Sequence, residues 1–74
     1  MINPATHYVG QVIHYNGHDY TVTEGPEFEY CPVAWTVNER NQETMLFLRL
    51  DDNSGEIIRA ATRNGSWQDV QIAA

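Results

Sequence analysis

The stretch "VIHYNGHDYTV", residues 12–22, decides the fold of this 74-residue chain. An Asn-Gly pair between two alternating runs is a strong hairpin signal, because a type I′ turn needs positive φ at both central residues. Asn16-Gly17 therefore predicts a two-residue β-turn. Counting outward from that turn pairs Tyr15 with His18, His14 with Asp19, Ile13 with Tyr20, and Val12 with Thr21.

Successive side chains of a strand point to opposite faces, so this register also predicts an interior. One face of the hairpin is apolar and the other is polar. The residues predicted for the core are Val9, Ile13, Tyr15, Tyr20 and Val22.

Turn signals recur along the rest of the chain, and the runs between them are rich in Val, Ile, Thr, Tyr and Trp, which is typical of an all-β protein. The predicted strands are 8–15, 18–24, 33–38, 44–50, 56–63 and 67–72. We expect one domain, an antiparallel meander of five to six short strands, with residues 1–7 as a flexible arm. Its length and strand density resemble the SH3-like small barrels. The alternative is an open curved sheet completed by dimerisation.

A second hairpin is predicted through "DNSG", residues 52–55, because Gly55 suits the left-handed position at the end of a three-residue loop. Its inward face would carry Leu46, Leu48, Leu50, Ile58, Ala60 and Thr62. The same register sets Arg49 across from Arg59, and like charges in that position are unfavourable. We therefore expect a carboxylate such as Asp51 nearby.

Asn64-Gly65 predicts a third hairpin, with Thr62 across from Trp67. In that register Val70 and Ile72 fall on the face of Arg59, which conflicts with an apolar interior. A bulge, or a strand that changes partners as a small barrel closes, would remove the conflict. Trp35 and Trp67 lie on apolar runs and are predicted to pack inside.

The negative net charge of the chain makes some classes of binding partner more favourable than others. Ten carboxylates face four arginines, lysine is absent, and the net charge is −6. Phosphate neutralisation needs clustered Lys and Arg, so direct binding to nucleic acid or to an anionic membrane is not expected. The same field favours association with a basic protein. Neither a secretory leader nor an 18-residue apolar run is present, and a cytoplasmic location is expected.

Candidate catalytic and metal-binding groups are few. His14 and His18 fall on opposite faces of the first hairpin, and Cys31 has no second cysteine. Zinc needs about four ligands in a tetrahedral array, and a reactive thiolate needs an electropositive setting. We therefore predict no catalytic residue, no metal site and no cofactor, and we expect that the chain is not an enzyme.

The stretch "EGPEFEYCP", residues 24–32, alternates acids with aromatic rings. In an extended chain the acids would point one way and the rings the other, so the rings could fold over the barrel while the acids line its rim. With the acids of the second hairpin loop, this predicts a partner-binding rim. Its residues are Glu24, Glu27, Phe28, Glu29, Tyr30, Asp51, Asp52 and Glu56.

In size and charge the chain resembles phage- or plasmid-encoded antagonists of host defence, such as anti-CRISPR and anti-restriction proteins. That resemblance implies an inhibitor or adaptor that docks on a basic, nucleic-acid-handling protein and presents carboxylates where phosphates would lie. The alternative is a homo-oligomeric structural or assembly protein, with a homodimer as its simplest form.

Overall fold

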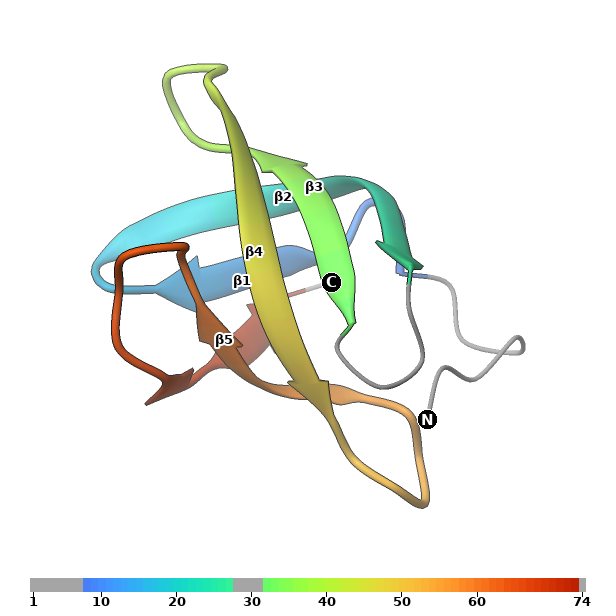
Figure 1. The fold of residues 1–74 in the computed structure, drawn as a ribbon. Helices are drawn as coiled ribbons and strands as arrows, with labels where there is room; N and C mark the ends of the chain where they lie inside the picture. Colours follow the sequence, from blue (N-terminus) through green and yellow to red (C-terminus); the bar gives the residue numbers. More distant parts are fainter. Residues whose placement is uncertain (1–7, 28–31, 74) are drawn as a thin grey trace.

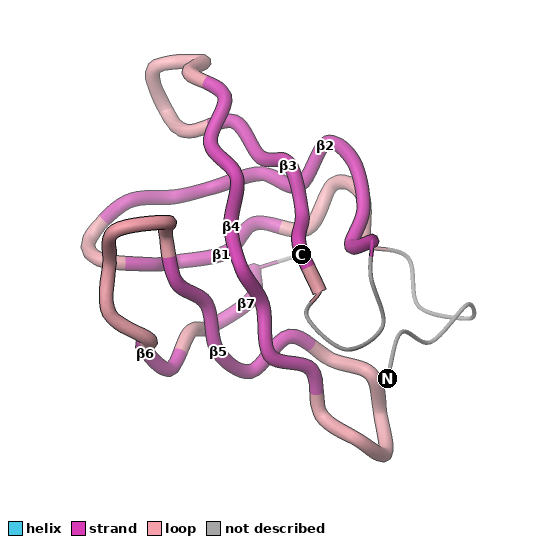
Figure 2. The backbone as a smooth tube through the Cα atoms, in the orientation of Figure 1, coloured by secondary structure: helices cyan, strands magenta, loops and turns pink. Residues whose placement is uncertain are grey.

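The computed structural model describes residues 8–27 and 32–73, and these residues form an antiparallel sheet that curls into a nearly closed barrel (Figures 1 and 2). The seven strands found in this part of the chain are β1 (Val12–Tyr15), β2 (His18–Glu27), β3 (Val33–Val37), β4 (Glu43–Leu50), β5 (Ile57–Ala61), β6 (Gln68–Asp69) and β7 (Gln71–Ala73). The predicted small all-β barrel is confirmed, with one strand more than expected. The described residues contain no helix that could cross a membrane.

The barrel closes through its last two strands. The order across the sheet is β6-β5-β4-β3-β2-β1-β7, so two strands that are neighbours in sequence lie at opposite ends of the order. β6 pairs with β5, whereas β7, one residue later, pairs with β1 and sets Ile72 across from Ile13. A change of partners was one of the two solutions that the face conflict in the sequence suggested.

The first hairpin has the predicted register, with Tyr15 opposite His18 and His14 opposite Asp19. Asn16 has φ 52° and Gly17 has φ 78°, the left-handed pair that a type I′ turn requires. The placement of Val9 in the core is wrong. Gly10, at φ 95°, sits in a turn before β1, and Val9 is left 62% exposed.

β2 extends three residues beyond the predicted end at Glu24 and continues through Pro26 to Glu27. Its pairing with β3 shifts register on both sides of Glu24. Bulges of this kind are where a strand accommodates a proline, which cannot donate to the ladder.

The second hairpin also has the predicted central register, with Leu48 opposite Ala60 and Arg49 opposite Arg59. A register shift after Arg49 then sets Leu50 opposite Ile57. As a result Ile57 is 4% exposed and Ile58 is 45% exposed, so the assignment of Ile58 to the interior is wrong.

The opposed arginines are compensated, but not by Asp51. The Arg59 Nε donates to the Asp69 carboxylate at 2.9 Å. The Arg49 guanidinium lies 4.8 Å from the centre of the Trp67 ring. One charge is thus paired with an acid and the other with an aromatic face. Both compensating groups come from the third hairpin.

The third hairpin turns one residue earlier than predicted. The Gly65 amide donates to the Thr62 carbonyl at 3.1 Å, so Arg63 and Asn64 are the central residues of the turn. Asp69 accordingly faces Arg59, and Thr62 does not face Trp67. This shift lets Val70 and Ile72 pack against the core.

The two tryptophans do not lie inside: Trp35 is 45% exposed and Trp67 is 41% exposed. Ala34 and Thr36, the neighbours of Trp35 on β3, point inward, and the Thr36 hydroxyl donates to the Thr44 carbonyl at 2.7 Å. The buried cluster is Tyr8, Ile13, Tyr15, Tyr20, Val22, Ala34, Leu46, Leu48, Ile57 and Ala60. Because successive side chains of a strand alternate, the inward Ala34 and Thr36 leave the Trp35 indole on the outside.

Candidate partner-binding site

The up-and-down order of the strands divides the barrel into two ends. The β1–β2, β3–β4 and β5–β6 connections share one end, which we call the turn end (residues 16–17, 38–42 and 62–67). The β4–β5 connection, residues 51–56, lies at the other end, and β2 also runs away from the turn end (Figure 1). We call this second region the loop end. The Tyr8 hydroxyl donates to the Gly55 carbonyl at 2.6 Å and so ties the start of the described chain to it.

The β4–β5 loop is held by Asp51. Its carboxylate accepts hydrogen bonds from the Asn53 and Ser54 amides at 2.8 and 2.9 Å. Its backbone carbonyl accepts from Gly55, which has φ 74°. The predicted left-handed Gly55 is therefore confirmed, and the loop has a defined backbone.

These hydrogen bonds affect the ionisation of Asp51. Donation from the Ser54 amide first, and from the Asn53 amide second, lowers the pKa of the Asp51 carboxyl below its ordinary value of 3.8. The oxygen that accepts both bonds is engaged within the loop. Asp51 therefore shapes the predicted rim, while the exposed Asp52 and Glu56 present their carboxylates to solvent.

The predicted rim acids that the structure describes come from two hairpins. Glu27 ends β2 and Asp51, Asp52 and Glu56 belong to the β4–β5 loop, so the topology brings segments from two hairpins to the loop end. Glu24 is exposed farther along β2, where it pairs with Trp35 of β3. Phe28, Glu29, Tyr30 and Cys31 lie outside the described residues.

The arginines are distributed in the opposite way. Arg40 and Arg63 belong to turns of the turn end, while Arg49 and Arg59 lie on β4 and β5 and are directed to Trp67 and Asp69. The loop end, as far as the structure describes it, therefore contains carboxylates without an arginine. Four of the ten carboxylates and none of the four arginines thus belong to residues 27 and 51–56.

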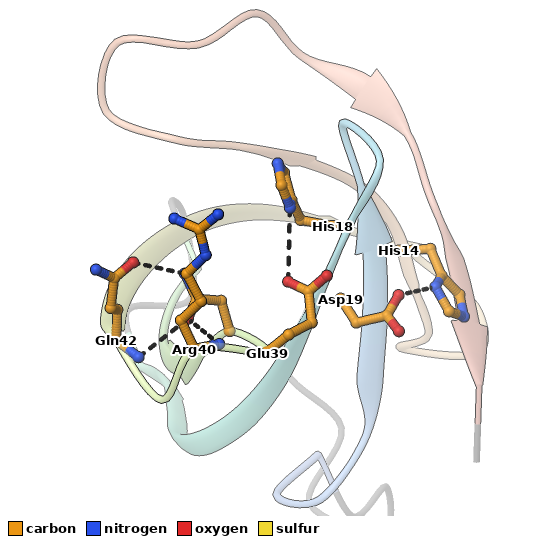
Figure 3. A network of polar contacts seen from close by, with 7 residues as sticks. His14, His18, Asp19, Glu39, Arg40 and Gln42 are labelled. Atoms are coloured by element: carbon orange, nitrogen blue, oxygen red, sulfur yellow. Dashed lines mark hydrogen bonds and ion pairs between the residues drawn. The ribbon is translucent and has the colours of Figure 1, made fainter.

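Carboxylates of the turn end are paired instead (Figure 3). The His14 ring contacts the Asp19 carboxylate, as the hairpin register predicted, and the His18 Nδ1 lies 3.5 Å from a Glu39 oxygen. All four side chains are about half exposed, so each pair contributes at most about 1 kcal/mol. Sequence reasoning missed Glu39, because only the β3–β4 turn brings it to His18.

A polar depression of about 420 Å³ lies beside this pair, lined by His18, Tyr20, Asn38, Glu39, Arg40 and Gln42. The Asn38 side-chain oxygen accepts from the Arg40 and Gln42 amides at 2.9 and 3.0 Å, which fixes the turn. Burial, and next the neighbouring Glu39 charge, raise the pKa of the Tyr20 phenol above 10.0. Tyr20 is therefore neutral at physiological pH and cannot act as a base there.

Metal ligation finds no support in this geometry. No group of three or more His, Cys, Asp or Glu side chains is placed to hold a metal ion within residues 8–27 and 32–73. The comparisons add no other chemistry, since no family model, curated protein or solved structure matches this chain. The features of the described residues that suggest a function are the positions of their charges and of their exposed apolar side chains.

Proposed function

We propose that the chain is a small protein-binding module, an inhibitor or adaptor, and that its loop end docks on a basic surface of a larger protein. The observation that carries the proposal is the segregation of charge, with carboxylates collected at the loop end and arginines elsewhere. A field of this kind orients an incoming basic partner and raises the association rate.

The backbone of the loop end suits such a role. Asp52 and Glu56 sit on a loop fixed by Asp51 and by the Tyr8–Gly55 hydrogen bond. A preformed loop loses little conformational entropy when a partner binds, and this improves affinity without any further contact. Glu24 is exposed on β2, and the sequence places Glu27, Phe28, Glu29 and Tyr30 a few residues after it.

The partner that best fits this chemistry is a cytoplasmic nucleic-acid-handling protein. Such a protein has a groove of Lys and Arg that holds phosphates, and fixed carboxylates at the rim would occupy the phosphate positions. The size and charge that resemble phage- and plasmid-encoded antagonists of host defence are consistent with this choice. Inhibition would follow from competition with the nucleic acid.

The experiment compares two double variants with the same change in net charge. Asp52→Lys with Glu56→Lys alters the loop end, whereas Asp19→Lys with Glu39→Lys alters the turn end. In affinity capture from the source cell, the wild type is expected to retain a basic nucleic-acid-handling protein at low salt and to release it at high salt. The loop-end variant should lose this protein, and the turn-end variant should keep it.

Two results would contradict the proposal. Equal loss in both variants would mean that only total charge matters and that the loop end is not a site. If the loop-end variant captures the protein as strongly as the wild type does, the carboxylates of the rim are not the binding site. Thermal unfolding of each variant is measured alongside, because a misfolded protein also fails to bind.

A further inference from the structure

One outward face of the barrel is apolar although it is open to solvent. On β3 and β4 the outward side chains meet as cross-strand pairs, Trp35 with Met45 and Val33 with Phe47. We call this surface, together with the neighbouring β5–β6 turn, the Trp35 face. Trp35 is 45% exposed, and Val33, Met45 and Phe47 are each only partly buried. Aromatic residues and Met are enriched in protein interfaces, and contiguous apolar surface on a small protein commonly marks an interaction site.

A shallow groove of about 420 Å³ crosses this face between β4 and the β5–β6 turn. Trp35 and Met45 form its apolar part, and Glu43 and Arg63 lie along it. These two residues are exposed and make no ion pair with each other or with another described residue. The groove thus offers one acid and one base, both available to an incoming surface.

Charged residues of both signs border the Trp35 face. The groove and strands β4, β5 and β6 carry Glu43, Arg49, Arg59, Arg63 and Asp69. On the other side β2 carries the exposed Asp19 and Glu24, and Glu24 lies directly across from Trp35. An excess of arginine on one side and acids on the other give this face a mixed charge that a second copy can complement.

We propose that a second copy of this chain covers the Trp35 face in a twofold dimer. In an isologous interface a residue and its counterpart exchange roles across the axis. Trp35 and Met45 of the two copies then pack together, and Glu43 of each copy pairs with Arg63 of the other. A groove that holds one acid and one base is self-complementary under this symmetry, which a basic or an acidic partner would not match as well.

Because the groove lies toward the turn end, the dimer leaves both loop ends free. Two acidic sites on one particle would strengthen binding to a repeated or dimeric basic target. The dimer does not depend on the function proposed for the loop end.

The test is the oligomeric state, measured by sedimentation equilibrium and light scattering from about 10 µM to about 1 mM. Wild type is expected to have twice the mass of the chain. Glu43→Arg and Arg63→Glu should each raise the dissociation constant about tenfold or more, as should Trp35→Ala. The double exchange of Glu43→Arg with Arg63→Glu should restore the wild-type constant to within about threefold, because it recreates the two intermolecular pairs.

Two control variants match these changes away from the face. Arg40→Glu reverses an exposed turn arginine, and Val9→Ala removes an exposed apolar side chain, so both should leave the dimer intact. A wild type that stays monomeric at 1 mM would overturn the proposal. The proposal would also be overturned if the double exchange weakened the dimer by the sum of the two single effects on the free energy of association. Circular dichroism on each variant verifies the fold, and the charge variants decide the question if Trp35→Ala does not fold.

Discussion

Gly65 shows how one position can require glycine for a reason that sequence alone does not give. The Asn-Gly pair predicted positive φ, yet the turn is centred on Arg63 and Asn64. What excludes a side chain is space: a Cβ at Gly65 would lie 2.3 Å from the Thr62 Oγ1 and 2.5 Å from the Tyr15 hydroxyl oxygen. The same Tyr15 hydroxyl donates to the Ser66 carbonyl at 2.9 Å, so the crowding belongs to a contact that fastens this turn to β1.

Gly65→Ala is accordingly expected to lower the free energy of unfolding by about 1–3 kcal/mol, the usual range for overpacking. Denaturant unfolding measures it. In a Tyr15→Phe background one of the two clashing atoms is absent, so the same substitution should cost less by about 0.5 kcal/mol or more. An equal cost in both backgrounds would show that Tyr15 is not the obstacle.

We expect Asp51 to make the stability of the folded protein depend on pH. Its pKa is lowered in the folded protein by the Ser54 and Asn53 amides, so its ionised form favours folding. That contribution is complete above the unfolded pKa, near 4, and is lost as the pH falls through the lower folded pKa. Asp51→Asn keeps an acceptor oxygen but removes the charge, and a neutral acceptor binds amides less strongly.

The difference in melting temperature between wild type and Asp51→Asn should therefore be largest above about pH 4 and should shrink with further acidification. Thermal scans at a series of pH values test this. A difference that stays constant into strong acid would mean that the carboxylate charge does not contribute to the loop.

At the scale of elements, alternation predicted most strands well, and its failures occur where a strand bends. The β1–β2 register was predicted pair by pair because the Asn-Gly turn fixes it. On β5 the same rule assigned Ile58 to the interior. The register shift between Arg49 and Leu50 adds one residue to β5, so that Ile57 faces the core and Ile58 faces solvent. Nothing in the local sequence marks this shift, since either isoleucine could face inward.

The two isoleucines provide a matched test of the β5 register. Ile57→Ala should cost about 2–4 kcal/mol because it opens a cavity in the core. Ile58→Ala removes the same atoms from an exposed position and should cost less than about 1 kcal/mol. Comparable costs, or a reversed order, would contradict the register described for β5 and restore the one predicted from the sequence.

On the scale of the whole molecule, the curled sheet determines which side chains face the core and which remain on the outside, where a partner can contact them. The change of partner at Val70 joins β5 to β1 through β6 and β7, and Ala34 and Ala60 belong to the core that the barrel encloses. Trp35 lies outside because its neighbours Ala34 and Thr36 take the inward positions of β3, and Trp67 lies against the Arg49 guanidinium. The apolar face proposed to bind a second copy thus follows from which side of β3 faces the core.

The same topology separates the charges. Every second connection lies at one end, so acids that are distant in sequence, at residues 27 and 51–56, share the loop end. The sequence could suggest this rim because its acids cluster in two connections. It could not show that Asp51 is engaged by its own loop, or that Glu39 is paired with His18, since those contacts depend on the folded turns.

The sequence by itself determined the all-β class, the first hairpin and its register, the opposed arginines and the excess of negative charge, because alternation, turn chemistry and composition are local properties. Tertiary structure alone decided the groups that compensate the arginines, the isoleucine that enters the core, the outward position of both tryptophans and the partners of the last strand. These outcomes depend on a one-residue shift and on the fit between distant strands, and such a shift changes which face every later side chain occupies.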